Sequence, residues 1–231
     1  MSLIMIEEFY LQNKDKVWNY EAIPSNEDPV NWVNWKCKYP WLKLQIDAPF
    51  KEMLREAKNI KHMFVEHRDD QSQGWKSICL HGIANDVTGP PQDHGYSNDT
   101  PRVWTEASEH CPVTTDYFKN VFPFSAYDRL RFMLVEPGGY IDVHYDGSKE
   151  DNPSRAVNIS LNNPNDCHLI TENGIVPFED AGSVIYFNVA YDHCVINNSS
   201  EDRYHIIVHG AETNQFMNVV LKSYESQINI T

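Results

Sequence analysis

The sequence predicts an α+β protein in which helices near the N-terminus pack on a double-stranded β-helix, the jelly-roll arrangement of eight antiparallel strands. Two observations lead to this fold class. From Leu130 onward, short runs of β-branched and aromatic residues alternate with Gly, Pro, Asn and Asp, a pattern typical of an antiparallel sandwich or barrel. Before them, residues 48–64 repeat apolar side chains at helical spacing.

The first 70 or so residues are expected to form a mixed or helical extension that packs on the strand-rich region. Within them, APFKEMLREAKNIKHMF (Ala48–Phe64) predicts one amphipathic helix, because Phe50, Met53 and Leu54 share a face. Trp and Tyr are frequent here, and we interpret them as core residues. A chain of 231 residues suits one domain with a sizeable core, so we expect residues 1–231 to form a single domain.

Three further elements are expected before the strand-rich region. Gly74–Gly82 (GWKSICLHG) has the composition of a strand between two glycines, and residues 83–102 form a loop rich in Gly, Pro, Asn and Asp. The segment CPVTTDYFKNVF (Cys111–Phe122) predicts a short helix with Thr114 or Thr115 as its N-cap.

The strand-rich region supplies the number of strands that a jelly roll needs. Eight runs follow one another in about eighty residues: LRFMLVE, YIDVHYD, RAVNISL, CHLIT, GIVPF, SVIYFNV, HCVIN and YHIIVHG. We therefore expect the jelly-roll core to occupy about residues 75–210.

Composition and charge exclude several classes of function. The net charge is −14, from 19 basic and 33 acidic residues, and such a surface repels phosphate backbones, so nucleic acid is not an expected partner. No apolar run approaches the ~20 residues of a membrane span. The N-terminus lacks the basic region of a signal peptide, and five cysteines without a CxxC pair favour free thiols, so a cytoplasmic location is expected.

The candidate site begins with His144 and Asp146, which follow the turn residues Pro137, Gly138 and Gly139. Residues i and i+2 of a strand point to the same face, so the imidazole and the carboxylate would project together. This pair alone is more often a surface pair than a ligand pair.

Two later residues extend the pair to a metal site. His193 opens another strand-like run, and Arg203 follows ten positions on. The order His-x-Asp, distant His, then Arg is that of a 2-His-1-carboxylate iron site, whose open positions accept a bidentate co-substrate and O₂. The Arg can bind a distal carboxylate through a forked pair of hydrogen bonds. His205 and His209 share strand parity with Arg203 and could face the same pocket, although core packing is the default interpretation of both.

Residues from about Trp75 to Gly210 resemble the aspartyl/asparaginyl β-hydroxylase family of Fe(II)/2-oxoglutarate oxygenases. The segments that carry the resemblance are, in order, GWKSICLHG, CPVT, MLVEPGGYIDVH, SRAVNISL, EDAGSVIYFN and HCVINNSSEDRYHIIV. The resemblance implies that His144, Asp146 and His193 bind iron and that Arg203 binds 2-oxoglutarate. Where the family often has a His that contacts the co-substrate, this chain has Asn158, whose amide can still donate a hydrogen bond.

The expected function is therefore that of an Fe(II)- and 2-oxoglutarate-dependent dioxygenase that uses O₂. The resemblance implies hydroxylation of an amino-acid side chain, of the Asp or Asn type in a polypeptide, or of a small molecule. Arg155 and Arg131 are the candidate substrate-binding residues.

Two other functions stay open from the residues alone. A cupin-type metal protein that does not use 2-oxoglutarate is one, since His193 and Asn197 are similar to the end of the second cupin motif. The first cupin motif, however, needs two His and a Glu close together, and only Asp146 follows His144. The other is a non-catalytic jelly-roll binding module. Metal content separates this module from the two metal proteins, and dependence on 2-oxoglutarate separates those two from each other.

Overall fold

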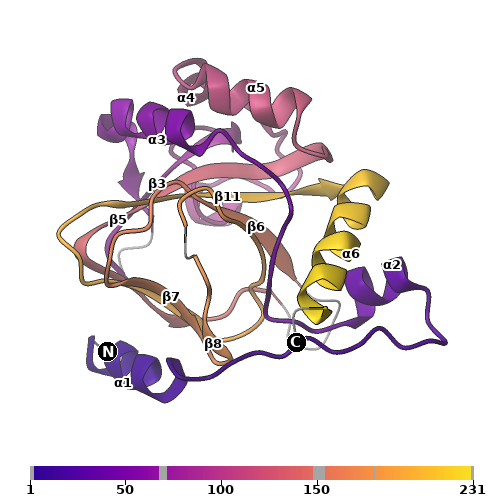
Figure 1. Ribbon diagram of the computed structural model, residues 1–231. Helices are drawn as coiled ribbons and strands as arrows, with labels where there is room; N and C mark the ends of the chain where they lie inside the picture. The colour runs from indigo at the N-terminus through magenta and orange to yellow at the C-terminus, as the bar shows by residue number, and fades with distance from the viewer. Residues whose placement is uncertain (1–2, 68–71, 148–153, 179, 230–231) are drawn as a thin grey trace.

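A curled antiparallel sheet with helices packed around it forms the centre of the molecule (Figure 1). This computed structural model describes residues 3–67, 72–147, 154–178 and 180–229. The strands of the main path lie in the order β1 (Trp41–Lys43), β9 (Val184–Asn188), β6 (Arg155–Ser160), β11 (Arg203–Glu212), β5 (Phe124–His144), β10 (His193–Asn197), β7 (Cys167–Thr171) and β8 (Gly174–Ile175). The predicted jelly roll with flanking helices is confirmed.

Strand β5 is longer than the sequence predicts. LRFMLVE and YIDVHYD were expected as two strands, because Pro137, Gly138 and Gly139 stand between them. The structure has one strand of 21 residues, Phe124–His144. Gly138 has a φ of +71°, and a Cβ on Gly139 would lie 2.7 Å from the Gln73 carbonyl oxygen. The glycines therefore let β5 bend beside β3 (Ser72–Gly82) and continue, so that it pairs first with β11 and then with β10.

The N-terminal residues contribute strands as well as helices. Strand β1 adds an edge to β9, and β2 (Val65–Glu66) pairs with β3. Helix α3 spans Phe50–Asn59 and is shorter than the predicted 48–64, because a 3-10 turn, η2 (Lys61–Met63), leads the chain into β2. The other elements before β3 are α1 (Leu3–Asn13), α2 (Pro29–Asn31) and a π-helical turn, η1 (Trp32–Lys36).

Helix α5 (Pro112–Asn120) agrees with the predicted helix, but its cap comes from another element. The buried Glu56 carboxylate on α3 accepts hydrogen bonds from the backbone N–H groups of Val113 and Thr114 at 2.7 and 2.9 Å, and from the Thr114 hydroxyl at 2.6 Å. A carboxylate at a helix N-terminus satisfies otherwise unpaired donors and interacts favourably with the helix dipole. Glu56 therefore joins α3 to α5, and neither Thr114 nor Thr115 is the N-cap.

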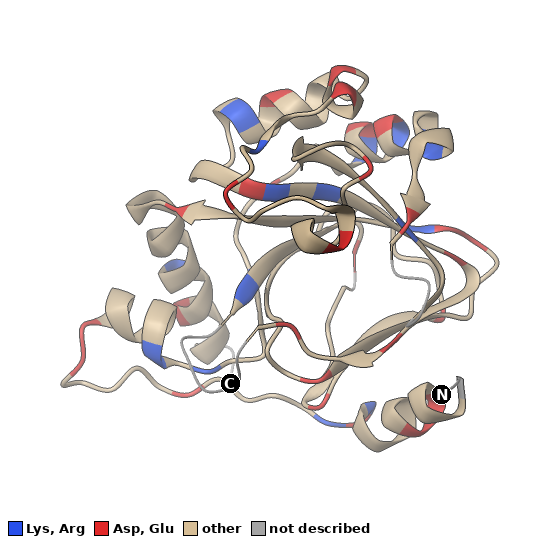
Figure 2. Cartoon of the chain, turned by 180° about the vertical axis from the view of Figure 1, so that it is seen from behind, with Lys and Arg blue, Asp and Glu red and all other residues tan. Residues whose placement is uncertain are grey.

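The remaining elements are η3 (Pro91–His94), β4 (Val103–Trp104), α4 (Glu106–Glu109) and α6 (Asn214–Ile228). None of the helices in the described part of the chain combines the length and the apolar composition that a bilayer-spanning helix requires. Acidic residues are spread over the outer helices and loops, whereas several basic residues lie within strands (Figure 2).

Two large apolar clusters pack against the sheet. The larger one fills the space between the sheet and the helices and includes Phe118, Phe132 and Tyr224. The second lies on the concave side of the sheet and includes Trp75, Val135, Leu169 and other residues that also line a cavity. The sheet therefore presents an apolar inner wall on which the polar residues of the site stand.

Candidate active site

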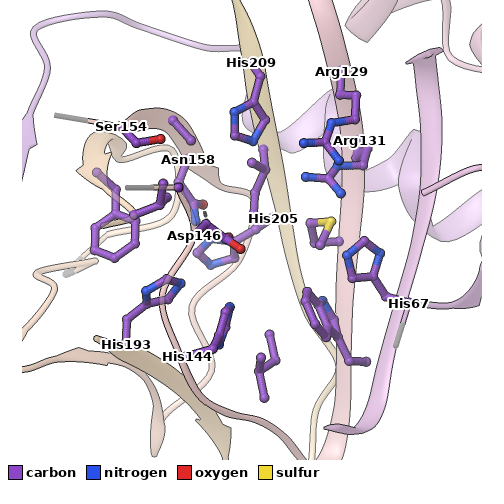
Figure 3. A pocket seen from close by; sticks show the side chains of 18 of the residues that line it. His67, Arg129, Arg131, His144, Asp146, Ser154, Asn158, His193, His205 and His209 are labelled. Carbon is purple, nitrogen blue, oxygen red and sulfur yellow. Dashed lines mark hydrogen bonds between the residues drawn. The ribbon is translucent and has the colours of Figure 1, made fainter. Parts of the chain in front are cut away.

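A cavity of about 550 Å³ lies inside the curled sheet. Its apolar wall includes Trp75, Val135, Ile141, Leu169 and Val195, and several histidines and arginines project into it (Figure 3). A mostly apolar pocket with a few convergent polar groups is the usual form of a small-molecule site.

Three potential metal ligands meet at one side of this cavity. His144 ends β5, Asp146 follows it, and His193 begins β10 directly opposite His144 in the antiparallel register. One ligand atom from each of the three residues lies within 4.8 Å of the others. The Asp146 N–H donates to the Val189 carbonyl at 2.8 Å, which holds the loop after β5 against the end of β9. The antiparallel pairing of β5 and β10 therefore brings together His144 and His193, which are 49 positions apart in the sequence (193 − 144).

Hydrogen bonds fix the tautomers of both histidines. His144 Nδ1 lies 2.7 Å from the Asp142 carbonyl oxygen, and His193 Nδ1 lies 2.8 Å from the Tyr191 carbonyl oxygen. A carbonyl only accepts, so each Nδ1 carries the proton and each Nε2 keeps its lone pair for a metal. Burial, and then the neighbouring His144, lower the pKa of His193 to about 4, which keeps its ring neutral near pH 7.

The donor set fits a divalent iron ion. Two neutral imidazoles and one carboxylate form the facial triad that leaves further coordination positions open. His193 is buried, His144 is partly buried and Asp146 is exposed, so the triad is reached from solvent on the Asp146 side.

A second polar group occupies the start of β11. Arg203 is 4% exposed, and its guanidinium lies 3.1 Å from His205 Nδ1. The same nitrogen of His205 lies 2.6 Å from Asn158 Oδ1 on β6. Burial lowers the pKa of Arg203, and burial, then Arg203, hold the pKa of His205 well below its usual range. His205 is therefore a neutral ring between a cation and an amide.

These three residues could hold an anionic co-substrate. Among the described residues, no carboxylate forms an ion pair with Arg203. His205 is 1% exposed, and its Nε2 has no hydrogen-bond partner in the described structure. A buried cation without a counter-ion and a buried polar nitrogen without a hydrogen-bond partner are costly among the described residues, so both favour a ligand with an oxyanion.

The two arginines that are predicted to bind substrate lie in different places, and only Arg131 lines the cavity that holds the three potential metal ligands. Arg131 on β5 is 5% exposed, lines the cavity and donates to the Thr88 carbonyl at 2.5 Å. Arg155 on β6 does not line this cavity. Its guanidinium donates to the Asn34 carbonyl at 2.8 Å and lies 4.0 Å from the centroid of the Tyr39 ring. Arg155 instead lines a second pocket, beside Arg102 and His209, and its substrate role stays a prediction.

Other cavity residues differ in how well the sequence signals them. His205 and His209 line the cavity with Arg203, which agrees with their strand parity. Arg129 was not predicted, although it stands two residues before Arg131 and the same parity rule points to it. His67 was also missed; its Nδ1 lies 2.7 Å from Ser77 Oγ, and it precedes β3 with no pattern that marks it.

The family model of the aspartyl/asparaginyl β-hydroxylases matches residues 43–212 of the sequence. The chain belongs to this family. It is therefore an Fe(II)- and 2-oxoglutarate-dependent oxygenase that uses O₂, as the sequence predicts, and the His144, Asp146 and His193 cluster could hold the metal. The match starts before Trp75, where the predicted resemblance begins, and so includes helix α3. No curated protein matches the sequence.

Solved structures with a similar chain path include other oxygenases. A prolyl hydroxylase from Trichoplax adhaerens, in complex with a hypoxia inducible factor peptide fragment, is 13% identical over 100% of this chain and 97% of that chain, with a TM-score of 0.46. A prolyl-4-hydroxylase from Pseudomonas putida is 13% identical over 80% and 100%, with a TM-score of 0.43. An oxidoreductase of the 2OG-Fe(II) oxygenase family from Burkholderia pseudomallei is 14% identical over 86% and 100%, with a TM-score of 0.45. Similarities of this size identify no substrate.

Proposed function

We propose that His144, Asp146 and His193 bind Fe(II), that Arg203 and Asn158 bind 2-oxoglutarate, and that the enzyme hydroxylates an amino-acid side chain. The observation that carries this proposal is the convergence of one imidazole nitrogen from each histidine and one carboxylate oxygen within 4.8 Å, in the same cavity as the buried Arg203. The family name favours an Asp- or Asn-type side chain, in a polypeptide or as a small molecule.

Fe(II), when bound, supplies the activation of O₂ that is coupled to the decarboxylation of 2-oxoglutarate to succinate and CO₂. The protein contributes position and charge. The carbonyls of Asp142 and Tyr191 hold the imidazoles with Nε2 facing the metal position. Arg203 orients the far carboxylate of the co-substrate through a charge-assisted hydrogen bond.

The other parts of the cavity limit water and orient the substrate. Trp75, Leu169 and Val195 form an apolar wall beside the ligands, which strengthens electrostatic interactions inside the cavity. Arg131 projects from the β5 wall and is the proposed contact for the substrate.

The buried Arg203 also bears on the alternatives. A cupin-type metal protein that does not use 2-oxoglutarate has no need of a buried guanidinium beside its metal, and a binding module has no need of the triad. Both remain as outcomes of the metal and co-substrate tests. The family membership and the Arg203 environment favour the dioxygenase.

We further propose a cytoplasmic location and one domain for the chain. All five cysteines are buried and free, which suits a reducing compartment. The pairing of β1 with β9 links the N-terminal part to the sheet. The negative charge disfavours nucleic acid as a partner.

Turnover of the co-substrate tests the proposed function. The protein is incubated with Fe(II), 2-oxoglutarate and O₂, and succinate is measured. We expect succinate from the wild type and from the exposed control His62→Ala, and at least about a hundredfold less from His144→Ala, since a lost metal ligand removes the reaction centre. Equal succinate from His144→Ala and the control would contradict the proposal.

A further inference from the structure

The cavity has a second concentration of positive charge, away from Arg203. Among the described lining residues, Arg102, Arg129 and Arg131 gather here beside the neutral His209, with one carboxylate, Asp128. The chain as a whole has a net charge of −14. An acidic ligand therefore gains no attraction from the overall charge and must be recognised by local groups of this kind.

The antiparallel register places these groups side by side. Arg129 on β5 is paired with His209 on β11, and Arg131 is paired with Ile207. Arg129 and Arg131 share a strand face, and Figure 3 shows both guanidinium groups pointing into the space beside His209. His209 lies six residues after Arg203 on β11, a distance of about 20 Å at about 3.3 Å per residue. One co-substrate carboxylate therefore does not occupy both ends of the cavity.

The Asp128 carboxylate pairs with Arg102 and Arg129, and the Arg102 pair holds the loop before β4. Asp128 lies 3.2 Å from Arg102 Nε and 3.5 Å from Arg129 Nε. Arg102 also donates to the Asn98 carbonyl at 2.9 Å, so this pair ties the loop to the start of β5. The Thr88 carbonyl fixes the orientation of Arg131. Positive groups are thus held in position around a cavity that a ligand can enter.

Burial and the two neighbouring arginines both act on the pKa of His209. Burial, then Arg131 and Arg129, lower the pKa of His209 to about 3. The ring is therefore neutral near pH 7 and can donate one hydrogen bond without adding charge.

We propose that Arg129, Arg131 and His209 form an oxyanion-binding subsite for the substrate, separate from the co-substrate subsite at Arg203. The substrate is accordingly an acid, with a carboxylate or phosphate that contacts both arginines, rather than the corresponding neutral amide or alcohol. This inference rests on the proposed function and chooses between the acidic and the amide substrates that the proposed function leaves open.

Binding to the co-substrate complex tests the subsite. The protein is first saturated anaerobically with Fe(II) and 2-oxoglutarate, so that Arg203 is occupied, and is then titrated calorimetrically with matched probes. The pairs are L-aspartate with L-asparagine, O-phospho-L-serine with L-serine, and a capped Ala-Asp-Ala peptide with its Asn counterpart. The first two pairs separate carboxylate from phosphate, and the third separates a free acid from a peptide side chain.

At least one acidic probe should bind the wild type about tenfold or more tightly than its neutral partner, since charge-assisted hydrogen bonds are the stronger ones. Arg129→Gln and Arg131→Gln should each reduce this preference about tenfold or more and leave the affinity for 2-oxoglutarate unchanged. Arg55→Gln, which removes an exposed charge on α3, is the control and should behave as the wild type.

The partly buried Arg129 makes Arg129→Gln the deciding variant if the more buried Arg131→Gln does not fold. Equal binding of acidic and neutral probes, binding of no acidic probe, or an unchanged preference in Arg129→Gln would overturn the subsite. A wild type that does not bind 2-oxoglutarate contradicts the proposed function instead, and this is seen before any probe is added.

Discussion

His144 and His193 lie directly opposite each other on β5 and β10, and each donates its Nδ1 proton to a carbonyl two residues earlier in its own chain. The two rings therefore have the same local geometry, with centroids 4.3 Å apart. The strand pairing therefore sets the separation of the two imidazoles, and the two local carbonyls set their tautomers. Asp146, two residues after His144, completes the triad.

The charge of Asp146 should be required for metal affinity. Asp146→Asn keeps the shape of the side chain but replaces a charged ligand by a neutral one, so we expect metal affinity to fall by at least about tenfold. Titration with Mn(II), followed by calorimetry, measures this without any turnover. Asp142→Asn is the matched control, because the contact of Asp142 with His144 is made by its backbone carbonyl, which the substitution keeps. Equal affinities in the two variants would remove Asp146 from the site.

Arg203 and His205 should both contribute to binding of 2-oxoglutarate. Loss of the charged partner in Arg203→Gln should weaken binding about a hundredfold, and His205→Phe, which removes the unpartnered Nε2, about tenfold. The dissociation constant of 2-oxoglutarate in the anaerobic metal complex is the measurement. Because a general loss of packing would also change metal affinity, a metal affinity equal to that of the wild type distinguishes the two causes. Wild-type binding by Arg203→Gln would contradict the assignment.

Glu56 should stabilise the fold by capping α5 from α3. Glu56→Ala leaves the N–H groups of Val113 and Thr114 without their acceptor, and we expect the free energy of unfolding to fall by about 2–3 kcal/mol. Urea unfolding at pH 7.5 measures this loss. Glu106→Ala, an exposed acid on α4, should change the free energy by less than about 0.5 kcal/mol. A similar loss in both variants would show that the cap is unimportant.

His209 should make the protein less stable in mild acid. Its pKa is about 3 in the folded protein and about 6.5 in an unfolded chain, so only the unfolded state takes up the proton as the pH falls below about 6.5. The free energy of unfolding should therefore be unaffected above pH 7.5 and fall by about 1–2 kcal/mol from this residue at pH 5. Comparing urea unfolding of the wild type and His209→Asn at pH 7.5 and pH 5.0 isolates the effect. The same acid sensitivity in both proteins would contradict it.

The sequence predicts the core of the fold and the members of the metal cluster because both follow from local patterns. Strand parity places Arg203 with His205 and His209, the spacing of two residues keeps Asp146 near His144 although β5 ends at His144, and turn residues mark most strands. The continuous β5 could not be predicted in this way, because Pro137 and two glycines signal a turn as strongly as a bend. Only the close approach of β3, seen at Gly139, shows which of the two occurs.

The remaining differences arise from contacts between distant segments. Glu56 and Val113 are far apart in the sequence, and no local motif relates a carboxylate on one helix to the N-terminus of another. Arg155 is the first residue of β6, a strand that lines the site, yet its guanidinium contacts the carbonyl of Asn34 and the ring of Tyr39. Parity decides to which face of the sheet the Cβ of a residue points, but the end of a long side chain is placed by contacts such as these.

The most direct test is the visible charge-transfer band of the Fe(II)–2-oxoglutarate chelate, measured anaerobically in the wild type, Asp146→Ala and Arg203→Ala. A weak band in the wild type that is lost or weakened in both variants is the predicted result. Metal bound to a folded wild-type protein without any band on addition of 2-oxoglutarate would contradict the co-substrate role and favour a cupin-type metal protein. Absence of both metal and band would leave a binding module.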